Sequence, residues 1–395
     1  MAQPEPAIDT APEPVAATGI DIAPVESKAD LDRFIKVPWP IYAGDPNWVP
    51  PLMIERRGHL SSKSNPFYRH ADVRLWLALR DGRPVGRISA QVNHAYLKRH
   101  QDATGHFGFI EAEDDPAVFA ALLGRAESWL AEQGMRRIRG PFCFSVNDEL
   151  GLLVDGFDRP PSLLMGHARP YYGPRMEQQG YVKAKDLIAY DFGVADNPLP
   201  KSAKAILSRL ERDPSVTVRG LRKSDYSQEV EAVLDIFNDA WSDNWGFVPM
   251  ADYEIAHLAK ELKVLIYEDF VAIAEVDGAP AAFGIGLPNI NEAIADLNGA
   301  LLPFGWAKLL YRLKGGKIRS ARLPLMGVRK QYHGTPLGVA LAFGVIDRLH
   351  RNHAAKGYTQ AELSWILEDN QSMRAIIEAA GAEPYKTYRI YEKDL

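Results

Sequence analysis

The chain has 395 residues, which corresponds to two or three domains of ordinary size and is enough to bury a large hydrophobic core. Its 46 basic and 51 acidic side chains leave a net charge of −5, so the charge gives no reason to expect a nucleic-acid partner. The single cysteine, Cys143, excludes an internal disulfide framework and multi-cysteine metal sites, which favours a cytoplasmic protein without a bound metal. No uncharged run reaches the roughly 18 residues of a membrane-spanning helix.

Residues 1–28 are expected to form a disordered, acidic tail rich in alanine and proline. Up to residue 27 the chain carries five acidic side chains and five prolines, and it has no lysine or arginine. The segment also lacks the basic start and the unbroken apolar run of a secretory signal. This tail accounts for the whole net charge, so the rest of the chain is neutral overall.

From residue 69 onward the sequence predicts alternating strands and helices, and their order occurs twice. Each copy opens with two strand-like runs that turn at an Asp-Gly pair, Asp81-Gly82 and Asp277-Gly278, a strong hairpin signal. In the first copy we expect strands at 73–79, 85–91, 107–112, 137–142 and 184–192, with helices at 116–133 and 175–179. In the second we expect strands at 216–221, 264–276, 281–287, 323–328, 360–367 and 385–392, with helices at 227–241, 251–262, 336–354 and 371–380.

The repeat predicts an α/β (α+β) fold of two tandem domains, each a mixed sheet flanked by helices. Each long helix begins with proline behind a good capping residue, at Asp115-Pro116 and Thr335-Pro336. We place the domains at 29–196 and 216–395, with 197–215 as the linker.

The loop before the second long helix suggests an anion site. It reads Val328-Arg329-Lys330-Gln331-Tyr332-His333-Gly334-Thr335-Pro336-Leu337-Gly338 and joins a strand to the start of a helix. Unpaired backbone amides and the helix dipole favour a phosphate at such a place. The first copy has Glu113-Asp114-Asp115-Pro116 there instead, and its carboxylates would repel a phosphate.

This order of elements resembles the GNAT acyltransferase superfamily over about residues 65–395. The resemblance implies that acyl-coenzyme A (acyl-CoA) is the co-substrate and that no metal is needed. Because the turn of the first copy is acidic, we expect only the second domain to bind the donor. The cofactor-binding residues it implies are Gly327, Val328, Arg329, Lys330, Gln331, Gly334, Thr335, Gly338 and Asn370. The loop departs from the family pattern Gln/Arg-x-x-Gly-x-Gly/Ala, because Pro336 stands where a glycine is usual. Ile377 also stands where many members have the tyrosine that protonates the departing thiolate.

The second copy contains an insertion near 297–322 that the first copy lacks. Leu302, Trp306, Leu309, Leu310 and Leu313 fall on one face of a predicted helix, with basic side chains on its flank. Between residues 297 and 346 there are eight lysines or arginines and no acidic residue. Such a segment binds an anionic membrane surface or covers an apolar ligand; the alternative is a helix that simply packs on the core. A protein of this kind would be peripheral on the inner face of the membrane.

Within the GNAT superfamily the chain looks most like the bacterial two-domain group that contains bacterial ceramide synthases. The segments that carry this resemblance are Phe107-Gly108-Phe109-Ile110-Glu111-Ala112, Arg139-Gly140-Pro141-Phe142, Gly151–Phe157, Leu302-Pro303-Phe304-Gly305-Trp306 and Tyr388-Arg389-Ile390-Tyr391-Glu392. It implies transfer of a fatty acyl group, from acyl-CoA or an acyl carrier protein, to the amine of a long-chain amino alcohol. A sphingoid base such as 3-ketosphinganine is the implied acceptor.

Amide formation needs a general base and an oxyanion donor within reach of the reacting atoms. The resemblance places the oxyanion amide near Gly327 and Val328. As catalytic residues we predict Glu362 first, then His333, with Glu275 third, and Asn370 beside the pantetheine arm; Asn370 can equally cap the following helix. The residues predicted to line the acceptor side are Trp241, Asp243, Trp245, Phe304 and Trp306.

Two other functions remain open at this point. One is a tandem transferase of other specificity, with a small acyl group or an aminoacyl-tRNA as donor. The other is a non-catalytic protein that binds acyl-CoA or a membrane, which the missing tyrosine and the incomplete glycine pattern allow. Hydrolase, kinase and zinc-protease motifs are absent from the sequence.

Overall fold

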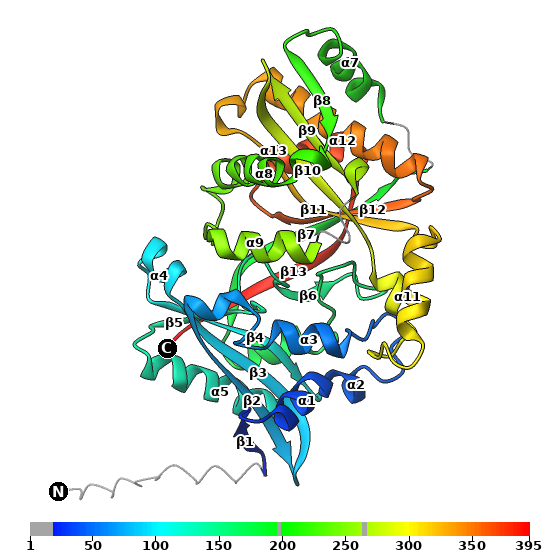
Figure 1. Ribbon diagram of the computed structural model, residues 1–395. Helices are drawn as coiled ribbons and strands as arrows, with labels where there is room; N and C mark the ends of the chain where they lie inside the picture. Colours follow the sequence, from blue (N-terminus) through cyan, green and yellow to red (C-terminus); the bar gives the residue numbers. More distant parts are fainter. Residues whose placement is uncertain (1–18, 196–198, 263–266) are drawn as a thin grey trace, which may run out of the picture.

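The computed structural model describes residues 19–195, 199–262 and 267–395, whose strands form one continuous mixed sheet (Figure 1). Its strands are β1 Asp21–Pro24, β2 Ala71–Arg80, β3 Arg83–Asn93, β4 Thr104–Ala112, β5 Arg137–Gly140, β6 Leu152–Asp155, β7 Val182–Gly193, β8 Val216–Gly220, β9 Val271–Val276, β10 Ala279–Pro288, β11 Ser320–Val328, β12 Gln360–Leu367 and β13 Glu383–Asp394. The α-helices are α1 Lys28–Lys36, α2 Pro38–Ile41, α3 Met53–His59, α4 His94–His100, α5 Pro116–Glu132, α6 Tyr172–Gln178, α7 Lys201–Leu210, α8 Tyr226–Trp241, α9 Asp252–Leu262, α10 Asn291–Ile294, α11 Gly305–Lys314, α12 Pro336–Ala355 and α13 Gln371–Ala379.

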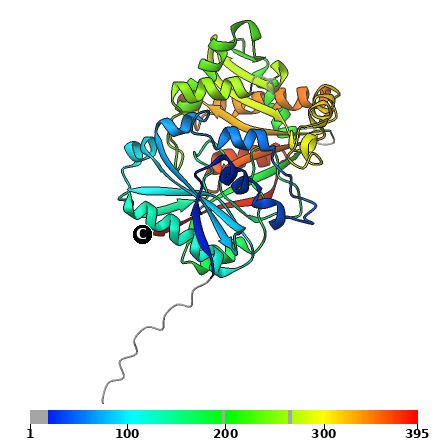
Figure 2. The same cartoon turned by 60° about the horizontal axis from the view of Figure 1, so that its bottom comes forward.

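The strand order shows that the two halves exchange their last strands. It runs β1-β2-β3-β4-β5-β13-β7-β12-β11-β10-β9-β8, with β6 paired to β13. Thus β13, the last strand of the chain, lies beside β5 of the N-terminal half, and β7 pairs antiparallel with β12 of the C-terminal half. Figure 2 shows the red β13 within the blue-to-cyan half. The two halves are therefore parts of one sheet.

The long helix of each half buries an apolar stripe against the sheet. Helix α5 places Leu122 and Leu130 at 0% exposure in the core of the N-terminal half. Helix α12 does the same with Leu341 and Val345 over β9, β10 and β11. Apolar side chains at these spacings make one face of a helix hydrophobic, and burial of that face holds it on the sheet.

The α/β class predicted from the repeat is confirmed, but three predicted segments differ. Residues 1–18 of the predicted tail lie outside the described residues, whereas Asp21–Pro24 form β1 and pair with β2. Within the predicted linker, Lys201–Leu210 form α7, whose Ala203 and Leu207 are buried beside α12; 197 and 198 are outside the described residues. The predicted strand 264–276 starts at Val271 in the structure, and 264–266 are again outside it. None of the helices in the described part of the chain could span a bilayer.

Candidate active site

A cleft opens where the parallel strands β11 and β12 separate. They pair only from Ser320 to Leu323 and from Gln360 to Leu363, and beyond these residues they diverge. Between them lies a cavity of about 790 Å³, which we call the β11–β12 cleft; it is also lined by the end of α8, the loop before α12, and α13. This volume is typical of a site for a small molecule or cofactor.

The predicted anion loop forms one wall of this cleft. Gly334 takes a positive φ of 71°, and Thr335 caps α12 by accepting the Gly338 amide at 3.0 Å. A Cβ on Gly338 would lie 2.1 Å from the carbonyl oxygen of Tyr332, so only glycine fits there. The amides of Lys330, His333 and Thr335 also have partners within the protein. The loop therefore offers a phosphate the positive end of the α12 dipole. Several of its backbone amides are already bonded within the protein and are not free to bind the phosphate.

Most of the predicted cofactor residues line the β11–β12 cleft. These are Gly327, Val328, Lys330, Gly334, Gly338 and Asn370. Asn370 also caps α13 by accepting the Met373 amide at 3.1 Å, so both proposed roles are compatible with its position. The prediction for Arg329 differs from the structure, because its side chain points away from the cleft. Its Nε donates to the Pro280 carbonyl at 2.7 Å and its Nη2 bonds Asp235. Gln331 is exposed on the turn before α12 and is not part of the lining either.

The backbone amide of Val328 faces the β11–β12 cleft. The next amide, of Arg329, donates to Ala281 of β10 at 2.8 Å. Successive amides of a strand point to opposite sides, so the Val328 amide points away from β10 and toward β12. The Val328 carbonyl points the same way and lies 2.7 Å from Nε2 of His333, which lines the cleft.

Three tryptophans and an ion pair close the side of the cleft nearest α8. Trp241 donates its Nε1 hydrogen to the Met326 carbonyl at 3.0 Å and packs edge-on against Trp365 at 5.8 Å between ring centroids. Asp243 bonds Lys330, and this contact lowers the pKa of its carboxyl group. Trp245, which lies under the guanidinium of Arg139, completes this wall. The three predicted acceptor-side residues in 241–245 thus do meet at the cleft.

Glu362 lies behind the cleft wall rather than in it. It is 5% exposed, accepts hydrogen bonds from Ser364 and Tyr385, and lies 3.7 Å from Nε of Arg322. Ser364 is the member of this cluster that lines the cleft, and its hydroxyl also accepts from Arg322 at 2.9 Å. Glu362 can therefore reach a ligand only through Ser364. Glu275, the third candidate base, is held by Arg219 near the β9–β10 hairpin.

Sequence reasoning missed the rest of this polar cluster. Ser364 follows Glu362 by two residues, so strand periodicity places both on one face, and that spacing could have identified it. Tyr385 and Arg322 come from distant segments, and no local pattern connects them with Glu362. Burial raises the pKa of the Tyr385 hydroxyl and lowers that of Arg322, so Tyr385 stays protonated.

Phe304 and Trp306 lie outside the cleft. They belong to a group of exposed apolar side chains on α11 and the loop before it: Leu302, Phe304, Trp306, Leu310 and Tyr311, which we call the surface patch. The basic charge beside the patch is partly neutralised, because Lys308 and Arg312 both bond Asp296. That pairing was not predicted, since Asp296 lies one residue before the insertion.

In the N-terminal half, β4 and the residues that follow β5 stay in contact beyond their parallel pairing. Phe142 donates its amide to the Phe107 carbonyl at 2.7 Å, and a Cβ on Gly108 would lie 1.8 Å from the Phe142 oxygen. The acidic turn before α5 is held by arginines, with Asp114 bonding Arg175 at 2.8 Å. A single donor site in the C-terminal half, which the acidic turn predicts, stays a prediction.

No model of a known protein family matches the chain. Comparison with individual proteins is more informative. The chain is 47% identical over 369 residues to the protein YghO of Escherichia coli, covering 93% of this chain and 94% of that protein. It is 48% identical over 385 residues to the bacterial ceramide synthase of Caulobacter vibrioides, covering 97% and 100% of the two chains.

Solved structures with low sequence identity share the fold. A tandem GNAT protein from the clavulanic acid biosynthesis pathway matches with a TM-score of 0.56 and 12% identity, over 95% of this chain and 98% of the other. A GCN5-related N-acetyltransferase of Sphaerobacter thermophilus matches with a TM-score of 0.52 and 14% identity, over 95% and 96%. The chain therefore has the tandem GNAT fold and belongs to the acyltransferase family that includes bacterial ceramide synthase and YghO.

Proposed function

We propose that this acyltransferase moves a fatty acyl group from acyl-CoA to the amine of a long-chain amino alcohol, a sphingoid base such as 3-ketosphinganine. The observation that carries the proposal is the β11–β12 cleft in a chain 48% identical to a bacterial ceramide synthase over its whole length. The helix dipole of α12 and the side chain of Lys330 supply positive charge for the coenzyme pyrophosphate. Asn370 follows β12 on the other wall of the cleft, where it can contact the pantetheine arm.

The Val328 amide is positioned to bind the oxyanion. The acceptor nitrogen attacks the thioester carbonyl carbon, and the negative charge that develops on oxygen is stabilised by a backbone N–H at hydrogen-bond distance. The C–S bond then breaks, the coenzyme leaves as a thiolate, and the proton lost by the amine passes to a base. No strand or helix has to move for this amide to face the cleft, because its neighbour Arg329 is bonded to β10.

Among the predicted bases, His333 has the better position. Its Nε2 hydrogen donates to the Val328 carbonyl, which leaves Nδ1 of the neutral ring to accept a proton. Glu362 is proposed as a positioning residue, because its contact with the cleft runs through the Ser364 hydroxyl. Through the same hydrogen bond His333 also fixes the end of β11, which carries the Val328 amide. One side chain would thus accept the proton and position the oxyanion donor.

We propose that the surface patch binds an anionic membrane on its cytoplasmic face. Leu302 and Phe304 are 80% and 78% exposed, and Trp306 is 50% exposed. Aromatic and leucine side chains insert at the headgroup boundary, and nearby lysines add attraction to anionic lipids. A lipid acceptor would reach the enzyme most readily from such a surface.

Thiol release tests the function directly. Purified protein is incubated with palmitoyl-CoA and a long-chain amino alcohol, with coenzyme release followed by a thiol reagent and the amide by mass spectrometry. Parallel reactions replace the donor with a palmitoyl carrier protein or add ribonuclease, which separates a carrier-protein or tRNA-dependent enzyme. Acyl-CoA consumption without amide, or no release with any amine, would refute the proposal.

A matched pair of variants tests the role of His333. Glutamine keeps a donor for the Val328 carbonyl but cannot take a proton, so H333Q is expected to lower kcat by about 10²-fold or more while acyl-CoA binding persists. His350 makes a comparable bond to the Val194 carbonyl at 3.0 Å outside the cleft, so H350Q serves as the control. Equal rates in the two variants would remove His333 from the base role.

A further inference from the structure

A second cavity lies in the N-terminal half and uses none of the residues that line the β11–β12 cleft. Its volume is about 600 Å³, and its walls come from α3, the end of β4 and the segment 161–167, with Ile290 and Ile294 of the C-terminal half at one side. We call it the α3 cavity. Most of its wall is apolar, which is typical of a ligand site, yet several charged groups also face it.

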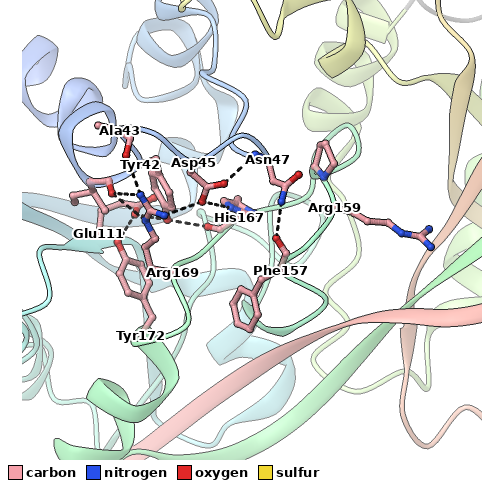
Figure 3. A network of polar contacts seen from close by, with 12 residues as sticks. Tyr42, Ala43, Asp45, Asn47, Glu111, Phe157, Arg159, His167, Arg169 and Tyr172 are labelled. Atoms are coloured by element: carbon pink, nitrogen blue, oxygen red, sulfur yellow. Dashed lines mark hydrogen bonds and ion pairs between the residues drawn. The ribbon is translucent and has the colours of Figure 1, made fainter.

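The polar part of the wall is a buried network around Glu111 (Figure 3). One oxygen of Glu111 accepts hydrogen bonds from Tyr42 at 2.9 Å and Tyr172 at 2.7 Å, and the other lies 3.6 Å from Arg87. Burial raises the pKa of the Glu111 carboxyl. In Figure 3 the loop carrying Asp45 meets this network, and His167 donates from Nε2 to Asp45 at 3.1 Å.

Two atoms of this wall have no partner within the described residues. They are Nδ1 of His167, whose side chain is 3% exposed, and Nε of Arg87, whose residue is 8% exposed. Because Nε2 of His167 donates to Asp45, its Nδ1 is an acceptor, whereas Nε of Arg87 is a donor. Leaving such groups buried and unpaired is unfavourable, and a ligand that offers both a donor and an acceptor would satisfy both atoms.

The α3 cavity opens beside the surface patch. Ile54 lines the cavity and is 66% exposed, which places it at the mouth. Its neighbour Met53 donates its amide to the Gly299 carbonyl at 2.9 Å, and Trp39 bonds Asn298 at 2.7 Å. The loop leading into the surface patch is thus held against α2 and α3, and an apolar chain that enters at Ile54 comes from the side that faces the membrane in our proposal.

The polar end of this cavity is far from the reaction cleft. Strand β4, which carries Glu111, and β11 are five strand spacings apart in the sheet, or about 24 Å at 4.8 Å per strand. A headgroup held by His167 and Arg87 therefore cannot be the amine that attacks a thioester beside Val328.

We infer that the α3 cavity is a second lipid site, which binds a single-chain amphiphile through its hydroxyl and amino groups and holds the chain toward Ile54. The identity of this amphiphile as an amino alcohol rests on the proposed function. A hydroxyl or ammonium group can donate to His167, and a hydroxyl oxygen can accept from Arg87. A fatty acyl chain or a deprotonated fatty acid offers no donor to the His167 nitrogen.

Binding of a soluble analogue to the full-length protein tests the site. A 2-amino-1,3-diol with a twelve-carbon chain is titrated by calorimetry without acyl-CoA, and dodecanoate is titrated in parallel. We expect the amino diol to bind, dodecanoate to bind at least tenfold more weakly, and saturating coenzyme A to leave the amino diol's affinity unchanged. Tighter binding of dodecanoate, or displacement by coenzyme A, would overturn the inference.

Two variants locate the bound chain. Ile54→Glu should weaken binding at least tenfold, whereas Val182→Glu, which alters a 60% exposed apolar residue that lines neither cavity, should not. His167→Leu should also weaken binding, and thermal melting checks that it folds. If Ile54→Glu binds like Val182→Glu, the site lies elsewhere. The calorimetric titration contains no acyl-CoA, so it is independent of the thiol-release assay. A protein that binds the amino diol but releases no thiol would refute the proposed function and support this inference. A protein that releases thiol but does not bind the amino diol at this site would support the function and refute the inference.

Discussion

Replacing Gly338 with alanine gives the sharpest test of the donor site. The added Cβ would lie 2.1 Å from the Tyr332 oxygen and 2.9 Å from its carbonyl carbon, although real Cβ contacts stay beyond 3.0 Å. Both atoms closer than 3.0 Å belong to the Tyr332 backbone and not to a flexible side chain, so the start of α12 must shift by about 1 Å relative to the loop. Overpacking of this kind costs about 1–3 kcal/mol of folding free energy. Because coenzyme binding needs the loop and the start of α12 in their unshifted positions, restoring them on binding takes up to the same energy from the affinity, which corresponds to roughly 5- to 150-fold.

The expected result is a rise in the KM for acyl-CoA and in the calorimetric Kd for coenzyme A within that range. Gly124→Ala is the matched control, because Gly124 is a helical glycine of α5, and a Cβ added to it would meet no atom within 4 Å. Alanine should stabilise that helix by about 0.5–1 kcal/mol and leave the KM unchanged. If a folded Gly338→Ala protein binds coenzyme A as tightly as the Gly124→Ala protein does, the start of α12 is not the pyrophosphate site.

Three further predictions address stability, the buried acid and the membrane surface. Burial lowers the pKa of His106 from about 6.5 to about 3, so below pH 6.5 the unfolded chain takes up a proton that the folded chain does not. The free energy of unfolding therefore decreases as the pH is lowered, by about 2 kcal/mol at pH 5. Urea unfolding of His106→Gln at pH 7.5 and pH 5 should not show this loss. If the variant loses as much unfolding free energy between the two pH values as the unmodified protein does, the reasoning is refuted. Glu362→Gln should lower thiol release about 10²-fold, and a folded variant with full turnover would exclude any role in catalysis. Phe304→Ser with Trp306→Ser should lower cosedimentation with phosphatidylserine vesicles at least tenfold, and loss of the same size in Val182→Glu would show that the patch is not the contact.

Local signals in the sequence were sufficient for the hairpins and the caps. Both Asp-Gly turns have positive φ at both residues, 51° and 75° at Asp81-Gly82 and 50° and 78° at Asp277-Gly278, as a two-residue hairpin requires. Asp115 and Thr335 cap their helices as predicted. In each case the residues that determine the geometry are neighbours in the chain, so a short window contains all the information.

Long-range pairing could not be predicted in the same way. β7 and β13 both end a similar series of elements, and nothing in either strand specifies which half it joins. β1 is four residues long within an acidic segment, and it forms because the edge of β2 is available. Glu362 carries a chemically suitable side chain, but its distance from the cleft depends on Arg322 and Tyr385, which reach it from other strands.

The place of β13 also constrains how the protein is made. β13 occupies residues 383–394 of a 395-residue chain, yet it pairs with β5, β6 and β7 of the first half. Domains usually fold as they leave the ribosome, from the N-terminus onward. Here the first half cannot complete its sheet until β13 has been synthesised, and until then the edges of β5 and β7 that pair with β13 are open to pairing with other chains. Nascent chains should therefore depend on chaperones until β13 has been synthesised, and deletion of β13 should impair folding of the first half rather than only the second.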